Sequence, residues 1–480
     1  MSIIVGRNNE IAELERLYNS GKPEFVAVYG RRRVGKTFLI KQVFKDRICF
    51  QHTGVSPVDG VNDKNRMKVQ LESFYYDLVE HGLEGFTMPK TWMEAFFQLR
   101  QLLLKINNGE RLVLFFDELP WMDTPKSGFL PAFENFWNGW CNGRDNIMLI
   151  VCGSAASWIL SNISRSKGGL YGRLTSEIKL MPFSLAECEE FFHNADIDFS
   201  RYDIARTYMV FGGVPYYLSY FIKGMSFTAN TDRVLFGRNP KLKDEFNRLF
   251  NAVFTNADDC KKIVRLLAER HSGYSREEIA KSTGIPYGGG LTNTLNALVE
   301  SDFVFKYQPY GTKGKSDTYK LTDNFCLFWL KYVEPNEHSD SFVTDNITAT
   351  IMDHWRGVAF EEVCFQHIKQ IRRALQIGGV ESRFSAWNIK GDGEQGAQID
   401  LLIVRADNVV NICEMKFSSN VYEIDSVEDS KIRNRIEMLK STLSPKQTVH
   451  LTMVTTYGVK PNMHSGFVQR QVTLDDLFER

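Results

Sequence analysis

The first 180 residues contain three uninterrupted apolar runs, and each run ends in a glycine-rich or polar segment. The runs cover residues 25–29, 112–116 and 147–152. Such continuous apolar character is typical of strands that are buried on both faces of a parallel sheet. Apolar residues at helical spacing follow the first run, from Phe38 to Phe44, which predicts a strand–loop–helix unit. The pattern therefore predicts an α/β fold built on a parallel sheet.

A different pattern begins near residue 257. It predicts an amphipathic helix at 260–268 and a second helix that Ser275 and Glu278 open as a capping box. Ser184 and Glu187 form a similar box upstream. A third helix and a two-stranded hairpin are predicted at residues 291–299, 303–307 and 318–321. Helix, helix–turn–helix and hairpin in this order predict a winged helix.

The last third of the chain returns to a mixed α/β pattern. A polar linker follows Pro335, and an amphipathic helix is predicted at 351–371. Two strands then meet at a turn formed by residues 406–408. We therefore expect a hairpin within a separate α/β domain.

Composition adds that the chain is a globular protein of several domains. It has 480 residues, of which 43% are hydrophobic and 24% are charged. Lysine plus arginine equals aspartate plus glutamate, at 58 each, so that bulk charge gives no attraction to nucleic acid. No signal peptide or run of roughly 18 apolar residues is present, which predicts a cytoplasmic protein without a membrane span. The eight cysteines form no Cys-x-x-Cys pair and are expected to be reduced thiols.

The loop after the first strand carries the clearest chemical signal. Residues 30–37 fit the pattern G-x-x-x-x-G-K-[ST], in which backbone N–H groups and a helix N-terminus surround phosphates. Lys36 is expected to reach the β- and γ-phosphates of ATP, and the Thr37 hydroxyl is expected to bind Mg²⁺. The predicted nucleotide-binding residues are Gly30, Arg31, Arg32, Arg33, Val34, Gly35, Lys36, Thr37, Phe38 and Ser154.

Two acids end the second apolar strand. Because ligands bind at the carboxyl ends of parallel strands, Asp117 is expected to hold Mg²⁺, and Glu118 to orient the attacking water as a general base. The alternative is that both acids only cap the next segment. Ser154 follows the third strand, where it can contact the γ-phosphate or the water, or instead serve as a helix N-cap.

Arg173 is the candidate for an arginine that stabilises charge in the transition state, within its own chain or from a neighbouring subunit. It follows a glycine and precedes an apolar run. The alternative is an ordinary ion-paired arginine at the surface. We therefore expect a second copy of the chain as one candidate partner.

Several segments in this order resemble the archaeal-type ATPase family, a AAA+/STAND-like group of P-loop ATPases. They are VYGRRRVGKT, DELPWM, CGSAAS, YGRLTSEI and FGGVPYYL. The resemblance implies that Ser154 occupies the position called sensor 1. It also implies that the opening segment with Gly6, Arg7 and Glu10 lies near the adenine, and that residues 212–215 belong to a helical lid near the nucleotide.

The winged helix leaves two roles open. The expected recognition helix holds Asn293, Thr294 and Asn296 but no arginine or lysine, the residues that usually read guanine. The residues expected to contact phosphates of a nucleic acid are Lys306, Lys313, Lys315 and Lys320. The domain could therefore bind DNA or act only as a structural relay within the chain.

The C-terminal hairpin carries a second candidate site. Glu414 and Lys416 alternate on one face of a strand, and a hairpin can bring Asp400 beside them. Such carboxylates suit Mg²⁺, and the pattern resembles PD-(D/E)xK nucleases, in which a helix glutamate, here Glu361, commonly completes the metal site. The usual proline before the first acid is absent, and an ion pair between Glu414 and Lys416 would produce the same pattern.

The sequence thus predicts a multidomain α/β protein that binds ATP and Mg²⁺. The expected parts are a P-loop core at 1–180, a helical lid at 181–255, a winged helix at 256–335 and a restriction-endonuclease-like domain at 345–480. ATP hydrolysis is expected to cause a conformational change that the winged helix transmits to the C-terminal site. The expected substrate of that site is a nucleic acid, with DNA favoured over RNA. The alternative is a switch protein whose C-terminal domain is an inactive docking or DNA-binding module.

Overall fold

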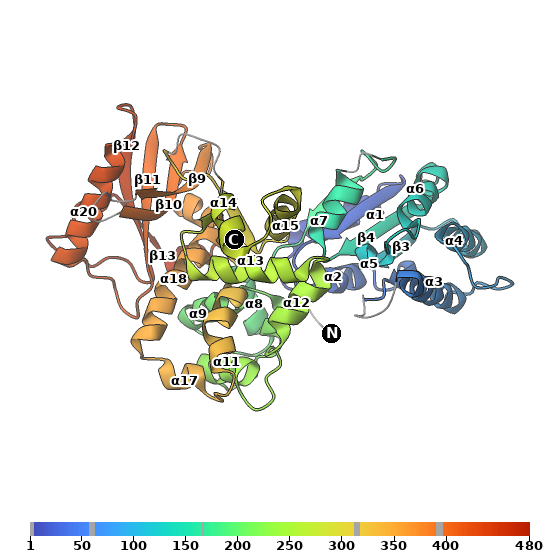
Figure 1. Ribbon diagram of the computed structural model, residues 1–480, viewed down its shortest axis with the longest axis horizontal. Coiled ribbons are helices and arrows are strands. Elements are labelled where there is room, and N and C mark those ends of the chain that lie inside the picture. The colour runs from blue at the N-terminus through green and yellow to red at the C-terminus, as the bar shows by residue number, and fades with distance from the viewer. Residues whose placement is uncertain (1–3, 57–62, 166–167, 312–316, 390–396) are drawn as a thin grey trace. The chain divides into compact units, whose positions relative to one another are not determined.

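The computed structural model describes residues 4–56, 63–165, 168–311, 317–389 and 397–480 (Figure 1). The chain forms two compact units. The first contains residues 1–182 and 248–257, and the second contains residues 183–247 and 258–480. The segments predicted as lid, winged helix and C-terminal domain therefore lie mainly in one unit.

The first unit is built on a five-stranded sheet in the order β2-β3-β4-β1-β5, and all four strand pairings are parallel. This confirms the predicted parallel sheet. Strand β4 lies between β1 and β3. The strands are β1 (Glu24–Tyr29), β2 (Ile48–Thr53), β3 (Leu112–Asp117), β4 (Ile147–Gly153) and β5 (Ser176–Lys179).

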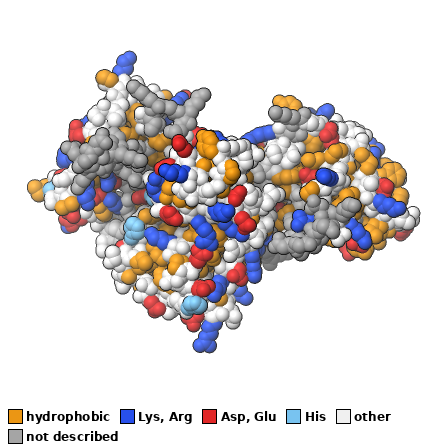
Figure 2. All heavy atoms as spheres, in the orientation of Figure 1, with side chains coloured by type: hydrophobic (Ala, Val, Ile, Leu, Met, Phe, Trp, Pro, Cys, Tyr) orange, Lys and Arg blue, Asp and Glu red, His pale blue; other side chains and the backbone are white. Residues whose placement is uncertain are grey.

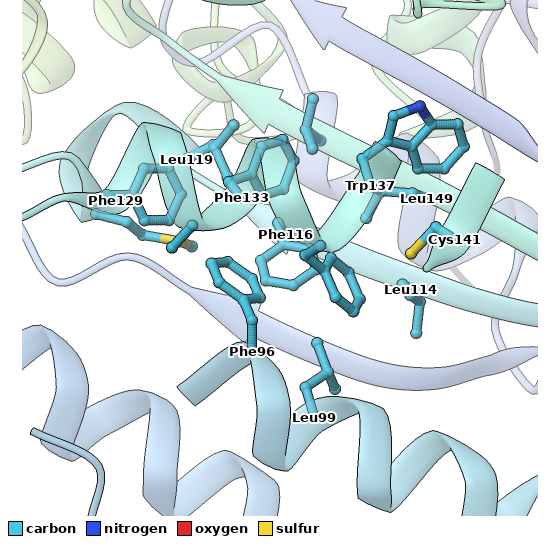
Figure 3. Close-up of a cluster of buried hydrophobic side chains, with 14 of the residues drawn as sticks. Phe96, Leu99, Leu114, Phe116, Leu119, Phe129, Phe133, Trp137, Cys141 and Leu149 are labelled. Carbon is cyan, nitrogen blue, oxygen red and sulfur yellow. The ribbon is translucent and has the colours of Figure 1, made fainter. Parts of the chain in front are cut away.

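Helices cover both faces of this sheet. On one face the buried residues of α1 (Asn8–Tyr18) and α2 (Lys36–Val43) share a cluster with Val26, Val28 and Phe115. The opposite face, drawn in Figure 3, packs Leu114, Phe116 and Leu149 against Phe96, Phe133 and Trp137. The helices on that face are α3 (Asp63–Glu80), α4 (Trp92–Ile106) and α6 (Phe129–Gly139). Because both faces are covered, β1, β3 and β4 are buried along their whole length, as their apolar runs predicted.

The short helices α5 (Leu119–Met122) and α7 (Ala156–Ile159) follow β3 and β4 directly. Pro120 of α5 packs against Gly153, where an added Cβ would lie 2.8 Å from the proline ring. This close approach fixes the ends of β3 and β4 beside each other. These two ends carry Asp117, Glu118 and Ser154.

The second unit begins with a group of helices. They are α8 (Leu185–Asn194), α9 (Arg201–Phe211), α10 (Pro215–Leu218) and α11 (Phe227–Leu235), followed by α12 (Glu245–Val253), in which the chain passes from the second unit to the first. The predicted capping box of Ser184 and Glu187 is present at the start of α8. Gly212 ends α9 with a φ of 63°.

The helix–helix–helix–hairpin order predicted in the middle of the chain is present. It consists of α13 (Ala257–Glu269), α14 (Arg276–Thr283), α15 (Gly289–Glu300), β7 (Val304–Tyr307) and β8 (Thr318–Leu321). Ser275 and Glu278 form the expected capping box. The short strand β6 (Tyr274–Ser275) pairs with β8 and completes a three-stranded sheet.

Further helices then lead to the last domain. They are α16 (Asn324–Phe328), α17 (Phe342–Asn346), α18 (Thr350–Gln366) and α19 (Ile368–Ala374). Phe328 and Tyr332 pack against Trp355 of α18, with ring centroids 5.3 and 5.7 Å apart. Buried aromatic contacts thus join this segment to the C-terminal part of the unit.

The C-terminal sheet has the strand order β13-β12-β11-β10-β9. Strand β10 (Ala397–Arg405) is antiparallel to both of its neighbours, β9 (Ser382–Ile389) and β11 (Val409–Lys416). The helix α20 (Ser426–Lys440) then crosses to β12 (Thr448–Thr455), which is parallel to β11 and to β13 (Arg470–Thr473). The short helix α21 (Leu474–Leu477) follows β13. The predicted hairpin of β10 and β11 is confirmed.

Basic and acidic side chains are interspersed on the face shown in Figure 2, in agreement with their equal numbers in the sequence. Within the described ranges, no helix combines the length and the apolar character that a membrane span requires.

Candidate nucleotide-binding site

The P-loop joins β1 to α2 and requires glycine at two positions. Gly30 has a φ of 146°, and a Cβ there would lie 2.2 Å from the carbonyl oxygen of Leu180. Gly35 has a φ of 93° and is the N-cap residue of α2. Both conformations are ones that residues with a side chain rarely adopt. The two motif glycines therefore shape the loop through backbone geometry.

Lys36 is almost completely buried, with 6% of its surface exposed. Its Nζ donates hydrogen bonds to the carbonyl oxygens of Gly30, at 3.0 Å, and Arg31, at 3.1 Å. Burial lowers the pKa of this amine, against the opposing effect of the nearby Glu118 and Asp117 carboxylates. A cation held by neutral carbonyls in this way is well suited to bind phosphate oxygens.

Thr37 and Asp117 bring the two expected Mg²⁺ ligands together. The Thr37 hydroxyl donates to Oδ2 of Asp117 at 2.7 Å, although 80 residues separate them in the sequence. Oδ1 of Asp117 accepts the backbone N–H of Glu118 at 3.1 Å. Asp117 is 5% exposed, and burial raises the pKa of its carboxyl group. A hydroxyl and a carboxylate at this place fit Mg²⁺, which prefers oxygen ligands.

Glu118 and Ser154 contact each other. Both the backbone N–H and the hydroxyl of Ser154 donate to Oε2 of Glu118, at 2.9 and 2.8 Å. Ser154 does not cap α7, because Ala155 is the N-cap residue and no side chain caps it. Glu118 stands at the N-cap position of α5 with a φ of 46°, but its side chain caps nothing. The capping alternatives for these two residues were therefore wrong.

The three arginines of the loop point to different partners. Arg31 is buried, at 2% exposure, and its Nη1 lies 3.4 Å from the carbonyl oxygen of Arg32. Nη1 of Arg32 donates to the carbonyl oxygen of Arg248 at 3.2 Å, within the same unit. Arg33 adopts a left-handed φ of 77°. The apolar members differ too, since Val34 is buried and Phe38 is 40% exposed.

Arg173 lies near the N-terminal ends of β1 and β5, whereas the P-loop follows the C-terminal end of β1. It is exposed and precedes β5, whose start is fixed by a hydrogen bond of 2.9 Å from the N–H of Thr175 to the carbonyl of Phe25. Gly30 follows Phe25 by five positions along β1, a span of about 16 Å. Arg173 is therefore located by its neighbours near the start of β1, while the P-loop follows the end of β1.

Two further segments were expected near the nucleotide. Arg7 belongs to the first unit, where its Nη2 donates to the carbonyl of Met181 at 2.7 Å. Gly213 belongs to the second unit, where its carbonyl accepts the N–H of Phe183 at 2.8 Å. A Cβ on Gly213 would lie 2.2 Å from the carbonyl oxygen of Phe183. Gly213 thus allows the two backbone segments to pack closely.

In the C-terminal domain, the two residues of the E-x-K pattern are bound to α20. Nη1 of Arg435 donates to Oε1 of Glu414 at 2.8 Å, and Nζ of Lys416 lies 2.7 Å from Oε1 of Glu428. Burial alone lowers the pKa of Lys416, but the bond to Glu428 and other acidic neighbours outweigh it and raise the pKa. Asp400 belongs to β10, and its side chain lies outside the described part of the structure.

Glu361, the expected helix ligand, faces the winged-helix segment. Its Oε2 lies 2.5 Å from Nε2 of His271. Next to it, Nζ of Lys320 lies 2.5 Å from Oε1 of the fully buried Glu362 and 3.2 Å from His271. Glu361 thus does not complete a metal site with Glu414. Within the ranges that the structure describes, no three histidine, cysteine, aspartate or glutamate side chains gather so that they could hold a metal ion.

Two of the lysines predicted to contact a nucleic acid, Lys306 and Lys320, are described by the structure, and both form ion pairs. Lys320 is buried in the ion pair with Glu362, which contradicts its expected role. Lys306 pairs with Asp317 at 2.7 Å. Lys313 and Lys315 lie outside the described residues. On the expected recognition helix α15, Asn293 and Asn296 are exposed, while Thr294 is buried.

The sequence interpretation missed Arg435, Glu428 and His271. Arg435 and Glu428 are seven residues apart, and therefore two turns apart on the same side of α20. The sequence shows this spacing. It does not show which strand faces this side of the helix, because that depends on how α20 crosses from β11 to β12. For His271 the sequence held no signal, because its partner Glu361 is 90 residues away.

The chain is similar in sequence to one protein family and to proteins of one archaeal organism. Residues 4–221 match the model of a family described as an ATPase domain predominantly from Archaea. An uncharacterized protein of Methanocaldococcus jannaschii is 25% identical over 405 residues, which cover 83% of this chain and 84% of that protein. An uncharacterized ATP-binding protein of the same organism is 44% identical over 45 residues, which cover 9% of this chain and 76% of that protein.

Among solved structures, the Walker-type ATPase of Pyrococcus abyssi is similar to 68% of this chain and 96% of its own, with 17% identity and a TM-score of 0.45. The family match is the result that bears on function. The matched residues 4–221 are similar to this ATPase domain and include the P-loop motif at residues 30–37.

Proposed function

We propose that this protein binds Mg·ATP at the P-loop and hydrolyses it, and that the nucleotide controls the C-terminal part of the chain. The contact of 2.7 Å between Thr37 and Asp117 carries the first half of this proposal. It supports a shared Mg²⁺ site, because the hydroxyl of the P-loop and the carboxylate of β3 are both oxygen ligands and lie in contact. Burial of Lys36 beside them supplies a cation for the phosphates.

Each residue has a defined role in this proposal. Mg²⁺ would be held by Thr37 and Asp117, and would neutralise charge on the phosphates. Lys36 binds the β- and γ-phosphates through Nζ. Glu118, oriented by Ser154, takes the proton of the attacking water. Because Arg173 lies near the start of β1 and the P-loop follows its end, we assign Arg173 to the nucleotide of a second copy of the protein.

The test is ATP turnover and nucleotide affinity of the whole chain. We expect Lys36→Ala to lose measurable turnover and to bind ATP at least about tenfold more weakly, and Asp117→Asn to lose turnover in Mg²⁺. Lys41→Ala is the matched control, because Lys41 lies on the same helix with an exposed side chain. Full turnover in Lys36→Ala would reject the proposal.

A nuclease is the second candidate for the C-terminal domain. The order α18–β9–β10–β11–α20–β12 resembles the core of restriction-endonuclease-like domains. The strand of Asp400 is antiparallel to the strand of Glu414 and Lys416, as that resemblance requires. The ion pair with Arg435 opposes metal binding at Glu414, since a metal ion would have to displace the guanidinium. This contact makes the docking module, controlled by the nucleotide, the stronger candidate.

Cleavage assays distinguish the two candidates. Linear, circular and single-stranded DNA would be incubated with Mg²⁺ or Mn²⁺, with and without ATP, and with wild type, Asp400→Ala and Lys36→Ala. Cleavage that disappears in Asp400→Ala and changes with ATP would favour the nuclease. If no substrate is cut above the Asp400→Ala background while ATP turnover is intact, the docking module stands.

The winged-helix segment is better suited to an internal structural role than to DNA binding. Its hairpin is joined to the C-terminal sheet, because the N–H of Tyr310 donates to the carbonyl of Ala386 at 2.9 Å. The Ser385 hydroxyl donates to the carbonyl of Gln308 at 2.8 Å. Together with the burial of Lys320, these bonds reduce the basic surface left for phosphates.

A further inference from the structure

The helices α8 and α9 are included in the sequence match to the ATPase family, but they pack against the C-terminal domain. The family match extends to residue 221 and therefore includes both helices. The same helices are part of the second compact unit, together with β9 to β13. Three specific contacts join them to the C-terminal domain.

The first contact is made by His367, which lies between α18 and α19. Its Nε2 accepts the backbone N–H of Leu185, the first residue of α8, at 3.0 Å, and its Nδ1 lies 2.7 Å from the carbonyl of Val363. The ring packs edge-on against Tyr208 of α9, with centroids 5.2 Å apart. Burial lowers the pKa of His367 to about 4, so that the ring is neutral and Nε2 can accept.

The second contact is a stack of aromatic rings at the start of α9. Tyr202 stacks on Phe417 with centroids 4.8 Å apart and planes 18° apart. Tyr457 lies parallel to the same tyrosine at 6.3 Å. Phe417 also contacts Phe360 of α18 at 5.3 Å. Since Phe417 directly follows Lys416, the first turn of α9 lies against the end of β11 that carries the E-x-K residues.

The third contact involves Arg201, the first residue of α9. Its Nη1 donates to Oδ1 of Asp475 in α21 at 3.0 Å, and its guanidinium lies 4.8 Å from the ring centre of Phe478. The start of α9 is therefore held on two sides, by the end of β11 and by the C-terminal helix.

The other end of α9 is fixed near the boundary of the ATPase core. Gly212 ends the helix, and the next residue, Gly213, accepts the N–H of Phe183 at 2.8 Å. Phe183 is the first residue of the second unit and lies four residues after the end of β5. If the segment that follows β5 moves, the hydrogen bond between Phe183 and Gly213 would pass this movement to the end of α9.

We propose that α9 transmits the nucleotide state of the ATPase domain to the end of β11 at Lys416 and Phe417, without passing through the winged helix. The sequence had suggested a relay through the winged helix. The hairpin of that segment also touches α18, through Phe305 and Phe365 at 5.2 Å. However, α9 is the element that joins Gly213 and Phe417. The inference rests on nucleotide binding at the P-loop.

Hydrogen exchange of the full chain tests this route. Peptides that cover residues 409–422 would be followed with ADP and with a non-hydrolysable ATP analogue. We expect the exchange of these peptides to differ between the two nucleotides in wild type and to become the same in Tyr202→Ala. Phe305→Ala is the matched control, because it removes a partly buried ring from the competing route. It should keep the difference.

ATP affinity and turnover are measured on the same three proteins. If wild type does not bind ATP, the proposed function itself fails. If wild type binds and hydrolyses ATP but residues 409–422 show no difference between nucleotides, the relay is wrong. It is also wrong if Tyr202→Ala keeps the difference, or if Phe305→Ala loses it. Phe417→Leu, which keeps an apolar side chain, should reproduce the loss and guards against a folding defect of Tyr202→Ala.

Discussion

Ser154 donates two hydrogen bonds to one oxygen of Glu118, from its backbone N–H at 2.9 Å and from its hydroxyl at 2.8 Å. The serine is fully buried at the end of β4, and the glutamate follows β3 with a left-handed φ of 46°. A buried donor next to a strained residue determines where the carboxylate lies. Ser154 therefore positions the candidate general base.

Loss of this hydroxyl should slow ATP hydrolysis. In Ser154→Ala one of the two hydrogen bonds remains, and we expect kcat to fall about tenfold, while the affinity for Mg·ATP changes less than about threefold. Steady-state kinetics and nucleotide titration measure both quantities. Ser161→Ala, which removes an exposed hydroxyl bound to the carbonyl of Trp158, should have no effect. An unchanged kcat in Ser154→Ala would contradict the assigned role.

Arg173 should act between two copies of the chain. Arg173→Ala alone and Lys36→Ala alone are both expected to hydrolyse ATP at least about tenfold more slowly than wild type. Mixed together, they should recover part of the activity, because Lys36→Ala supplies the arginine and Arg173→Ala supplies an intact P-loop. ATP turnover over a series of mixing ratios measures this. If no ratio exceeds the sum of the separate activities, Arg173 does not act in this way.

The buried His367 makes stability depend on pH. Its pKa in the folded chain is about 4, below the ordinary value of 6.5. Between these values the unfolded chain binds more protons, so that stability falls as the pH is lowered from 6.5 to 4, by about 3 kcal/mol. Urea unfolding at several pH values measures the loss. His367→Gln, which keeps an acceptor for Leu185, should lose less, while the exposed His338→Gln should behave as wild type.

The ion pair of Lys320 and Glu362 should stabilise the fold only as a pair. Lys320→Met removes the lysine partner of the fully buried Glu362 carboxylate, which then keeps His271 at 3.7 Å. We expect the free energy of unfolding to fall by about 3–5 kcal/mol. The double variant Lys320→Met/Glu362→Leu should be more stable than Lys320→Met. Urea unfolding of wild type, both single variants (Lys320→Met and Glu362→Leu) and the double variant measures the coupling. Additive losses would show that the pair contributes nothing of its own.

The arrangement of the candidate nucleotide site could largely be predicted from the sequence. The P-loop, Asp117 and Glu118 follow apolar strands directly, and parallel strands align their carboxyl ends at one edge of the sheet. Local order along the chain was therefore enough to assemble Thr37 with Asp117. What the sequence left open was the partner of Ser154, because three readings of a small polar residue at a strand end have the same local pattern.

The C-terminal site shows the limit of the same reasoning. Glu414 and Lys416 were correctly placed at the end of a strand in a hairpin, but each pairs with a residue of α20 instead of with the other. Glu361 was assigned to the metal site on the basis of the resemblance alone. The direction of the Glu361 side chain depends on which side of α18 faces the winged-helix segment. Helical periodicity shows which residues share a side of a helix but not which element packs against that side.

The sequence by itself determined the elements of this protein and the residues of its P-loop, because these depend on hydrophobic periodicity, on backbone conformations that need glycine and on short strand-to-helix connections. Only the tertiary structure decided that Arg173 lies near the start of β1 and not at its end, that Lys320 is buried and that Tyr202 of α9 stacks on Phe417. These are contacts between residues 42 to 215 positions apart. Their energies come from burial and ion pairing, which depend on how complete elements pack and not on the local sequence.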